Sequence, residues 1–114
     1  MLAIESETLD HIFLALGSPI RRRILHYLAE SGEATVTDIA APFDVSLNAI
    51  SKHMKVLENA GLIQREIRGR EHYCRLHPQA LIDTAEWLNY YRHFWTIRLD
   101  TMERHLLARP KAEE

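Results

Sequence analysis

The sequence predicts a mainly α-helical domain with one β-hairpin, in the order ααααββα, and three observations lead to this prediction. Four segments before residue 61 carry apolar residues at helical spacing. Between Leu62 and Leu76 the pattern changes to alternation on either side of Gly69-Arg70, which predicts two strands and a turn. After Pro78 a helical stripe of apolar residues continues to about residue 108.

The first two helices follow each other closely. The first is expected over about residues 6–16, where the apolar residues that share one face are Leu9, Ile12, Phe13 and Leu16. Ser18 suits the N-cap of the second helix and Pro19 its first position. Gly32 is a usual terminator, so the second helix is expected to end there.

The third and fourth helices form a helix-turn-helix pattern. Thr35 or Thr37 is expected to cap a short third helix, which Pro42 closes. Ser46 is expected to cap a longer fourth helix that ends at Gly61. A short helix, a tight turn and a longer helix in this order are typical of helix-turn-helix units.

The last helix, from Gln79 to about Ala108, carries an unusual number of aromatic residues. Five of the nine aromatic residues of the chain fall within nine positions, and they are Trp87, Tyr90, Tyr91, Phe94 and Trp95. One helix of a small monomer cannot bury so many rings on a single face. We therefore expect this helix and the first helix to form a homodimer interface.

Length and composition exclude several classes of protein. The 114 residues suffice for one domain, which we expect to span residues 1–114. No apolar run approaches the roughly 20 residues of a membrane span, and because Glu5, Glu7 and Asp10 stand where a secretory signal would carry basic residues, we do not expect export. A single cysteine, Cys74, cannot form an internal disulfide and favours the cytoplasm. No catalytic triad, carboxylate pair or glycine-rich phosphate loop can be assembled, so neither enzyme activity nor a cofactor is expected.

Local charge indicates double-stranded DNA as the partner, although the net charge of the chain is −2. Between Ser46 and Arg75 there are six basic and three acidic residues. The second helix of a helix-turn-helix enters the DNA major groove, where Asn48 can pair with adenine and Ser51 can bond either base type. The candidate DNA-binding residues are Ser46, Leu47, Asn48, Ala49, Ser51, Lys52, His53, Lys55, Arg68 and Arg70.

Two segments resemble one known family. VSLNAISKHMKVLENAGLIQREIRGREHYCRL, with LALGSPIRRRILHYLAE upstream, is similar to the second helix, recognition helix and wing of ArsR/SmtB-type winged helix-turn-helix transcriptional regulators. The resemblance covers roughly Leu9 to Leu76 and, more loosely, the last helix. It implies a homodimeric repressor that binds an imperfect palindrome, with Arg68 and Arg70 at the wing tip. The implied interface residues are Leu9, Ile12, Phe13, Leu16, Leu88, Tyr91, Trp95, Leu99 and Met102.

The metal-binding motifs of that family are missing. The third helix, residues 35–39, has no thiol, and on the last helix Asp83 is followed by Ala85 instead of histidine. We therefore expect no metal site of the family's usual kind, and no effector is indicated. A metal site formed across a dimer is a competing hypothesis, and its ligands would be His93, Asp100, Glu103 and His105. Two further hypotheses are a regulator that senses a small molecule at the interface and a winged helix that binds only proteins.

Several residues have an ordinary structural interpretation beside a functional one. Arg21, Arg22 and Arg23 either contact phosphate or form a solvated helix face. Cys74 is expected to be a half-buried small apolar residue rather than a redox sensor.

Overall fold

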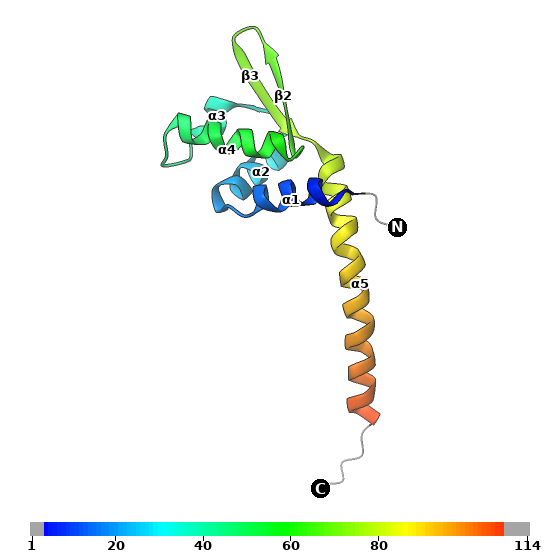
Figure 1. The fold of residues 1–114 in the computed structure, drawn as a ribbon. Helices are drawn as coiled ribbons and strands as arrows, with labels where there is room; N and C mark the ends of the chain where they lie inside the picture. Colours follow the sequence, from blue (N-terminus) through cyan, green and yellow to red (C-terminus); the bar gives the residue numbers. More distant parts are fainter. Residues whose placement is uncertain (1–3, 109–114) are drawn as a thin grey trace.

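The computed structural model describes residues 4–108, and it shows a mainly helical domain with a small antiparallel sheet (Figure 1). The predicted fold class is therefore confirmed. In chain order the elements are α1 (Ser6–Leu16), α2 (Pro19–Ser31), β1 (Ala34–Thr35), α3 (Val36–Ala40), α4 (Leu47–Asn59), β2 (Ile63–Arg68), β3 (Glu71–Leu76) and α5 (Pro78–Ala108).

Hydroxyl caps set the beginnings of three helices. The Ser18 hydroxyl accepts a hydrogen bond from the Arg21 amide at the start of α2, and the Ser46 hydroxyl accepts from the Ala49 amide at 3.0 Å at the start of α4. At the start of α3 it is Thr35, not Thr37, that caps, because its hydroxyl accepts from the Asp38 amide. Such caps satisfy amides that have no partner inside the helix.

A short strand, β1, joins the expected hairpin. It pairs antiparallel with β3, with Ala34 opposite Cys74 and Thr35 opposite Tyr73, so the sheet order is β1-β3-β2. Two residues are too short to show the alternation by which strands are detected. The pairing brings the segment after α2 beside the hairpin, and this placement matters for the wing.

The core lies between α1, α2, α3, α4 and the base of the hairpin. Its fully buried side chains are Ile12, Ile24, Leu28, Ile39, Ile50, Met54, Leu57, Leu62 and Cys74. Cys74 is thus fully buried rather than half-buried, and burial raises the pKa of its thiol. A buried thiol of raised pKa is a poor nucleophile, which agrees with a packing role.

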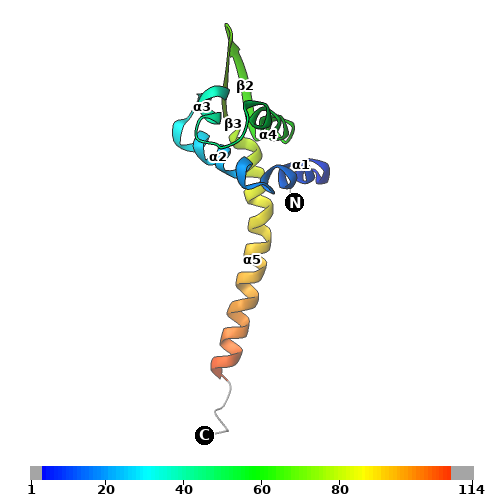
Figure 2. The same ribbon diagram turned by 90° about the vertical axis from the view of Figure 1, so that its left-hand side faces the viewer.

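Two elements project from opposite ends of this core, the β2–β3 hairpin and α5 (Figures 1 and 2). The 31 residues of α5 form a helix of about 46 Å. Its first three turns pack on the rest of the chain, through Ala80, Leu81, the buried Thr84 and Trp87, which contacts Phe13 of α1. From Leu88 to Ala108 every side chain is exposed. None of the described helices is long and apolar enough to cross a membrane.

Candidate DNA-binding interface

The exposed face of α4 carries most of the residues expected to contact DNA. Leu47, Asn48, Lys52 and Lys55 are exposed, and Ser51 is partly buried beside them. The opposite face is anchored in the core by Ile50, Met54 and Leu57, each with no exposed surface. This burial fixes the rotation of the helix, so the polar face points outward and is rigidly held.

A polar groove continues from this face to the wing. It has a volume of about 620 Å³ and lies between the start of α3, Ser51 of α4 and the hairpin. Thr37 and Ser51 supply hydroxyl groups, and Arg70 at the hairpin turn supplies a guanidinium group. Gly69 forms that turn with a positive φ of 63°. Hydroxyl and guanidinium groups are typical donors to DNA phosphates, and here they share the groove with the carboxylates of Asp38 and Glu71.

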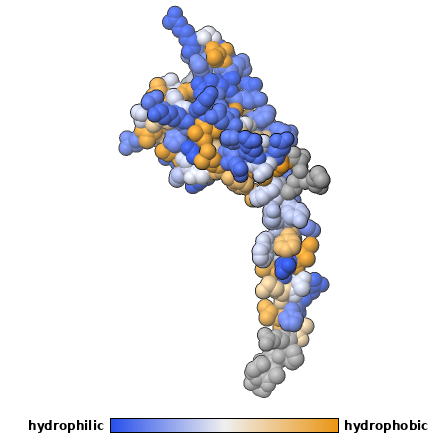
Figure 3. Space-filling view, viewed as in Figure 1, coloured by the Kyte–Doolittle hydropathy of each residue, from blue (hydrophilic) through white to orange (hydrophobic). Residues whose placement is uncertain are grey.

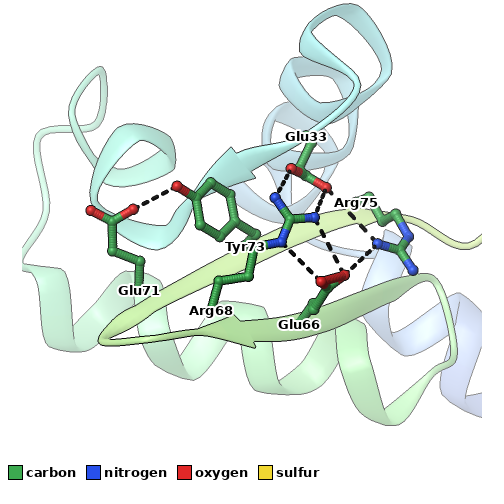
Figure 4. Close-up of polar contacts among 6 residues, drawn as sticks. All are labelled: Glu33, Glu66, Arg68, Glu71, Tyr73 and Arg75. Atoms are coloured by element: carbon green, nitrogen blue, oxygen red, sulfur yellow. Dashed lines mark hydrogen bonds and ion pairs between the residues drawn. The ribbon is translucent and has the colours of Figure 1, made fainter.

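Arg68, the last residue of β2 before the hairpin turn, is held by carboxylates (Figure 4). Its two terminal nitrogens donate to Glu33 at 2.7 and 2.9 Å, and Nε donates to Glu66 at 2.9 Å. The guanidinium also lies 4.5 Å from the centre of the Tyr73 ring, while Arg75 pairs with Glu66 at 3.2 Å. Hydrogen bonds from Arg68 and Arg75 lower the pKa of Glu66. Arg68 is thus tied to the protein rather than extended from the wing tip.

Arg65, on the same strand but on the opposite face of the hairpin, is paired in the same way. Its terminal nitrogens contact Glu58 of α4 and, at 3.2 Å, the Nδ1 atom of His72. Three of the six basic residues between Ser46 and Arg75 therefore contact carboxylates. Within residues 4–108, the three that form no ion pair are Lys52, Lys55 and Arg70.

His53 is partly buried and lies against Arg21 of α2. Its Nδ1 atom lies 3.1 Å from a terminal nitrogen of Arg21, and burial and the charge of Arg21 lower its pKa. The same Arg21 donates to the carbonyls of Leu14 and Ala15, both at 2.8 Å. The expected phosphate or guanine contact of His53 competes with this placement, because the ring is partly buried and its Nδ1 atom already lies against the Arg21 guanidinium.

The arginine run of α2 also has internal roles. Arg22 donates to the Leu16 carbonyl at 2.6 Å, so Arg21 and Arg22 together cap the last carbonyls of α1. Arg23 lies over the Phe43 ring at 4.5 Å. These contacts favour the structural interpretation of the run over phosphate binding.

The expected dimer residues divide into two groups. Leu9 and Ile12 have exposed fractions of 8% and 0%, so the prediction that they face a second chain is wrong, because their surface is used within the chain's own core. Leu16 is half-buried. The exposed members are Phe13, Leu88, Tyr91, Trp95, Leu99 and Met102.

The exposed members lie along α5 and beside it. The ring of Phe13 packs edge-on against that of Trp87, with 5.5 Å between ring centres, and the Trp87 and Tyr91 ring centres are 4.9 Å apart. The space-filling view shows apolar surface in orange along α5 below the domain (Figure 3). Along residues 4–108, no three histidine, cysteine or carboxylate side chains gather in a group that could hold a metal ion.

Several parts of this interface could not be seen in the sequence. Glu33 lies far from the wing along the chain, and only the pairing of β1 with β3 brings it to Arg68. The contact between Arg21 and His53 joins α2 to α4, and no sequence pattern within either helix predicts it. Thr37 and Tyr73 are also far apart in the sequence, and they meet in the groove because β1 pairs with β3.

Comparisons with known proteins agree with this geometry. A family model described as a helix-turn-helix domain matches residues 16–66. The transcriptional repressor SdpR of Bacillus subtilis is 34% identical over 80 residues, which cover 70% of this chain and 88% of SdpR.

Two solved structures have the same fold. One, described as an ArsR family transcriptional regulator, is 35% identical with a TM-score of 0.76, and the match covers 82% of this chain and 96% of the other. An ArsR-like transcriptional regulator from Rhodococcus sp. RHA1 is 28% identical with a TM-score of 0.74, over 91% and 94% of the two chains. The chain therefore belongs to the ArsR family of winged helix-turn-helix transcriptional regulators and carries its DNA-binding unit.

Proposed function

We propose that this protein is a cytoplasmic, homodimeric repressor that binds an imperfect palindrome in DNA and does not sense metal ions. The observation that carries the proposal is the rigid polar face of α4, with Asn48, Lys52 and Lys55 exposed and a groove leading to Arg70. Similarity to SdpR, a transcriptional repressor, supports repression as the outcome of binding.

The contacts with DNA divide by chemistry. Asn48, in the first turn of α4, can form a bidentate pair with adenine, and Ser51 one turn later can bond a base edge or a phosphate. Lys52, Lys55 and Arg70 contribute charge to the phosphates, which positions the protein without reading sequence. Ser46 caps the helix and holds its first turn in shape.

The dimer accounts for the exposed apolar surface of α5. Trp95, Leu99 and Met102 are each more than half exposed, and Leu88 nearly so. A second copy that covers this stripe would remove it from water and place two α4 helices against successive major grooves, about 34–36 Å apart. The whole chain, residues 1–114, then acts as one DNA-binding domain, with α1 and α5 as its dimerisation elements.

The absence of metal sensing is supported by the residues that replace the family's ligands. Residues 35–39 of the third-helix region carry no thiol, and Cys74 is buried in the sheet. His93, Asp100, Glu103 and His105 lie exposed along α5. Addition of zinc is therefore expected to leave operator affinity unchanged, and a change would indicate that these residues assemble a site across the dimer.

The decisive test is selection of genomic fragments by the purified protein, followed by anisotropy titration of the best fragment at several salt concentrations. We expect an enriched imperfect palindrome and a steep salt dependence. Weak binding that ignores sequence would contradict the proposal and favour a winged helix that binds proteins.

A separate test addresses the dimer. Light scattering of the eluted protein should give twice the 13.3 kDa of one chain, and Leu99→Lys should give the mass of a monomer because it would bury an unpaired charge. Glu86→Lys is the matched control, since it adds a lysine on the opposite face of α5. Equal masses for the two variants would contradict an interface along this stripe.

A further inference from the structure

A second groove lies away from the wing, between α2 and the connection from α3 to α4. Its volume of about 460 Å³ falls in the range of small-molecule sites. The walls are mainly apolar and come from Pro19 and Tyr27 of α2 and from Pro42 and Phe43 of the connection. The proposed DNA contacts use none of these residues.

The rim of this groove carries the charged or titratable side chains of Arg22, Arg23, His26 and Glu30, and the guanidinium of Arg23 is less engaged than that of Arg22. Arg22 donates to the Leu16 carbonyl, and His26 pairs with Glu30 at 2.8 Å. Arg23 lies over the Phe43 ring at 4.5 Å, and its side chain forms no hydrogen bond or ion pair with any other residue between 4 and 108. Its N–H groups therefore border an apolar groove and remain available to an acceptor.

We propose that this groove binds a small aromatic carboxylate, whose ring contacts Tyr27 and Phe43 and whose carboxylate accepts hydrogen bonds from Arg23. Arginine forms bidentate hydrogen bonds with a carboxylate, and aromatic side chains receive a flat ring. A DNA phosphate is the other anion that the rim could meet. The apolar walls favour the carboxylate, because a phosphodiester has no ring to place against them.

The groove is coupled to the DNA-reading helix through the chain itself. Phe43 packs against the core, and its amide donates to the Ala40 carbonyl at 3.0 Å. Three residues later Ser46 caps α4. A ligand that draws Arg23 away from Phe43 changes the packing of this connection and hence the position of the first turn of α4. Binding is therefore expected to lower operator affinity, a step that rests on the proposed function.

The binding test uses 1-naphthoate as the probe in calorimetric titration of the full chain. Arg23→Gln should weaken binding about 10- to 100-fold, because the charge-assisted hydrogen bonds are lost. Naphthalene methanol, which has the ring without the carboxylate, should bind the wild-type protein as weakly as naphthoate binds the variant.

The matched control is Arg98→Gln. Arg98 lies over the Phe94 ring of α5 at 4.8 Å, so it forms the same kind of cation–aromatic pair on another surface. Its loss should leave naphthoate binding unchanged. Equal weakening by the two substitutions, or no weakening by Arg23→Gln, would overturn the proposal, since the probe would then be held by exposed apolar surface elsewhere.

A second measurement tests the coupling. Anisotropy titration of the selected operator fragment should show weaker binding by the wild type when naphthoate is present, and no change for Arg23→Gln. Unchanged wild-type affinity at saturating naphthoate would overturn the regulatory role. Two results together would overturn the site: the wild type does not bind naphthoate, and Arg23→Gln binds DNA more weakly than the wild type. Arg23 would then be a phosphate contact. Calorimetry needs no DNA. The naphthoate result therefore stands even if the operator selection fails, and the two failures can be told apart.

Discussion

The recognition helix α4 and the wing both carry basic residues, but they use them differently. Lys52 and Lys55 of α4 are exposed, and neither forms an ion pair with a residue that the structure describes. In the wing, Arg65, Arg68 and Arg75 all contact carboxylates. The net charge counted along a sequence segment therefore overstates the positive charge on its surface. It omits acidic residues such as Glu33, which lie outside the segment in sequence but contact it in the fold.

The paired arginines of the wing serve chiefly to position it. Individual exposed ion pairs contribute only about 0.2–1 kcal/mol to stability. Arg68, however, joins Glu33 before β1 to Glu66 on β2 and stacks on Tyr73 of β3. This network links all parts of the sheet and fixes the direction in which the hairpin projects, which places Arg70 beside the groove.

The largest expected effect comes from α4. Asn48→Ala should lose discrimination of about 1–3 kcal/mol at one base pair of each half-site, because a bidentate adenine contact disappears. Anisotropy titrations of operators substituted at each position would locate the loss. Asn59→Ala is the matched control, since Asn59 is exposed at the other end of the same helix. A uniform loss across all operators would show that Asn48 does not read a base.

The second effect compares two arginines of the hairpin. Arg70→Ala should weaken binding to all sequences about equally and reduce the slope of log affinity against log salt by about 0.9, as expected for one phosphate contact. Arg75→Ala, which removes an arginine already paired with Glu66, should change the slope less. Equal slope changes would show that pairing does not withdraw the wing arginines from DNA.

Much of the fold followed from local sequence patterns. Ser18, Ser46 and Gly61 mark helix ends by chemistry that acts within a few residues, and the structure confirms all three. The change from helical to alternating spacing after Gly61 likewise located the hairpin. These features need no knowledge of distant contacts, which is why the sequence sufficed to predict them.

The rest depended on contacts between distant segments. Leu9 and Ile12 share a helix face with Phe13 in the sequence, but packing against the chain's own core buries the first two and leaves Phe13 39% exposed. His53 is a polar residue on the helix expected to contact DNA, yet its Nδ1 atom is in contact with Arg21 from α2. Spacing along one helix shows which residues share a face, and only the neighbouring elements decide what that face meets.

A smaller effect would test the role of Glu33. Glu33→Gln removes the bidentate partner of Arg68 and one negative charge beside the wing. DNA affinity should rise roughly two- to fivefold for all sequences, with a steeper salt dependence, while the free energy of unfolding falls by less than about 1 kcal/mol. Anisotropy titration and urea denaturation measure the two quantities. Unchanged affinity would show that Arg68 stays bound to Glu66 or does not reach DNA.

The smallest effect concerns pH and separates His53 from the charged residues of α4. Burial and Arg21 lower the pKa of His53 in the folded chain below its ordinary value of 6.5. As the pH falls, the unfolded chain therefore takes up a proton at this site before the folded chain does. The stability that the site contributes is fully present above about pH 6.5 and is lost as the pH falls through the folded pKa.

Urea denaturation at a series of pH values would test this link between α4 and α1. His53→Gln should remove part of the loss of stability below about pH 6.5. His26→Gln is the control, because the His26 side chain is 77% exposed and pairs only with Glu30 of its own helix. If the two variants follow the same pH profile, folding does not lower the pKa of His53, and the ring is as free as an exposed histidine to take up a proton and contact a phosphate. If only His53→Gln departs from the wild type, the ring is a neutral connector whose acceptor nitrogen holds Arg21 against the end of α1.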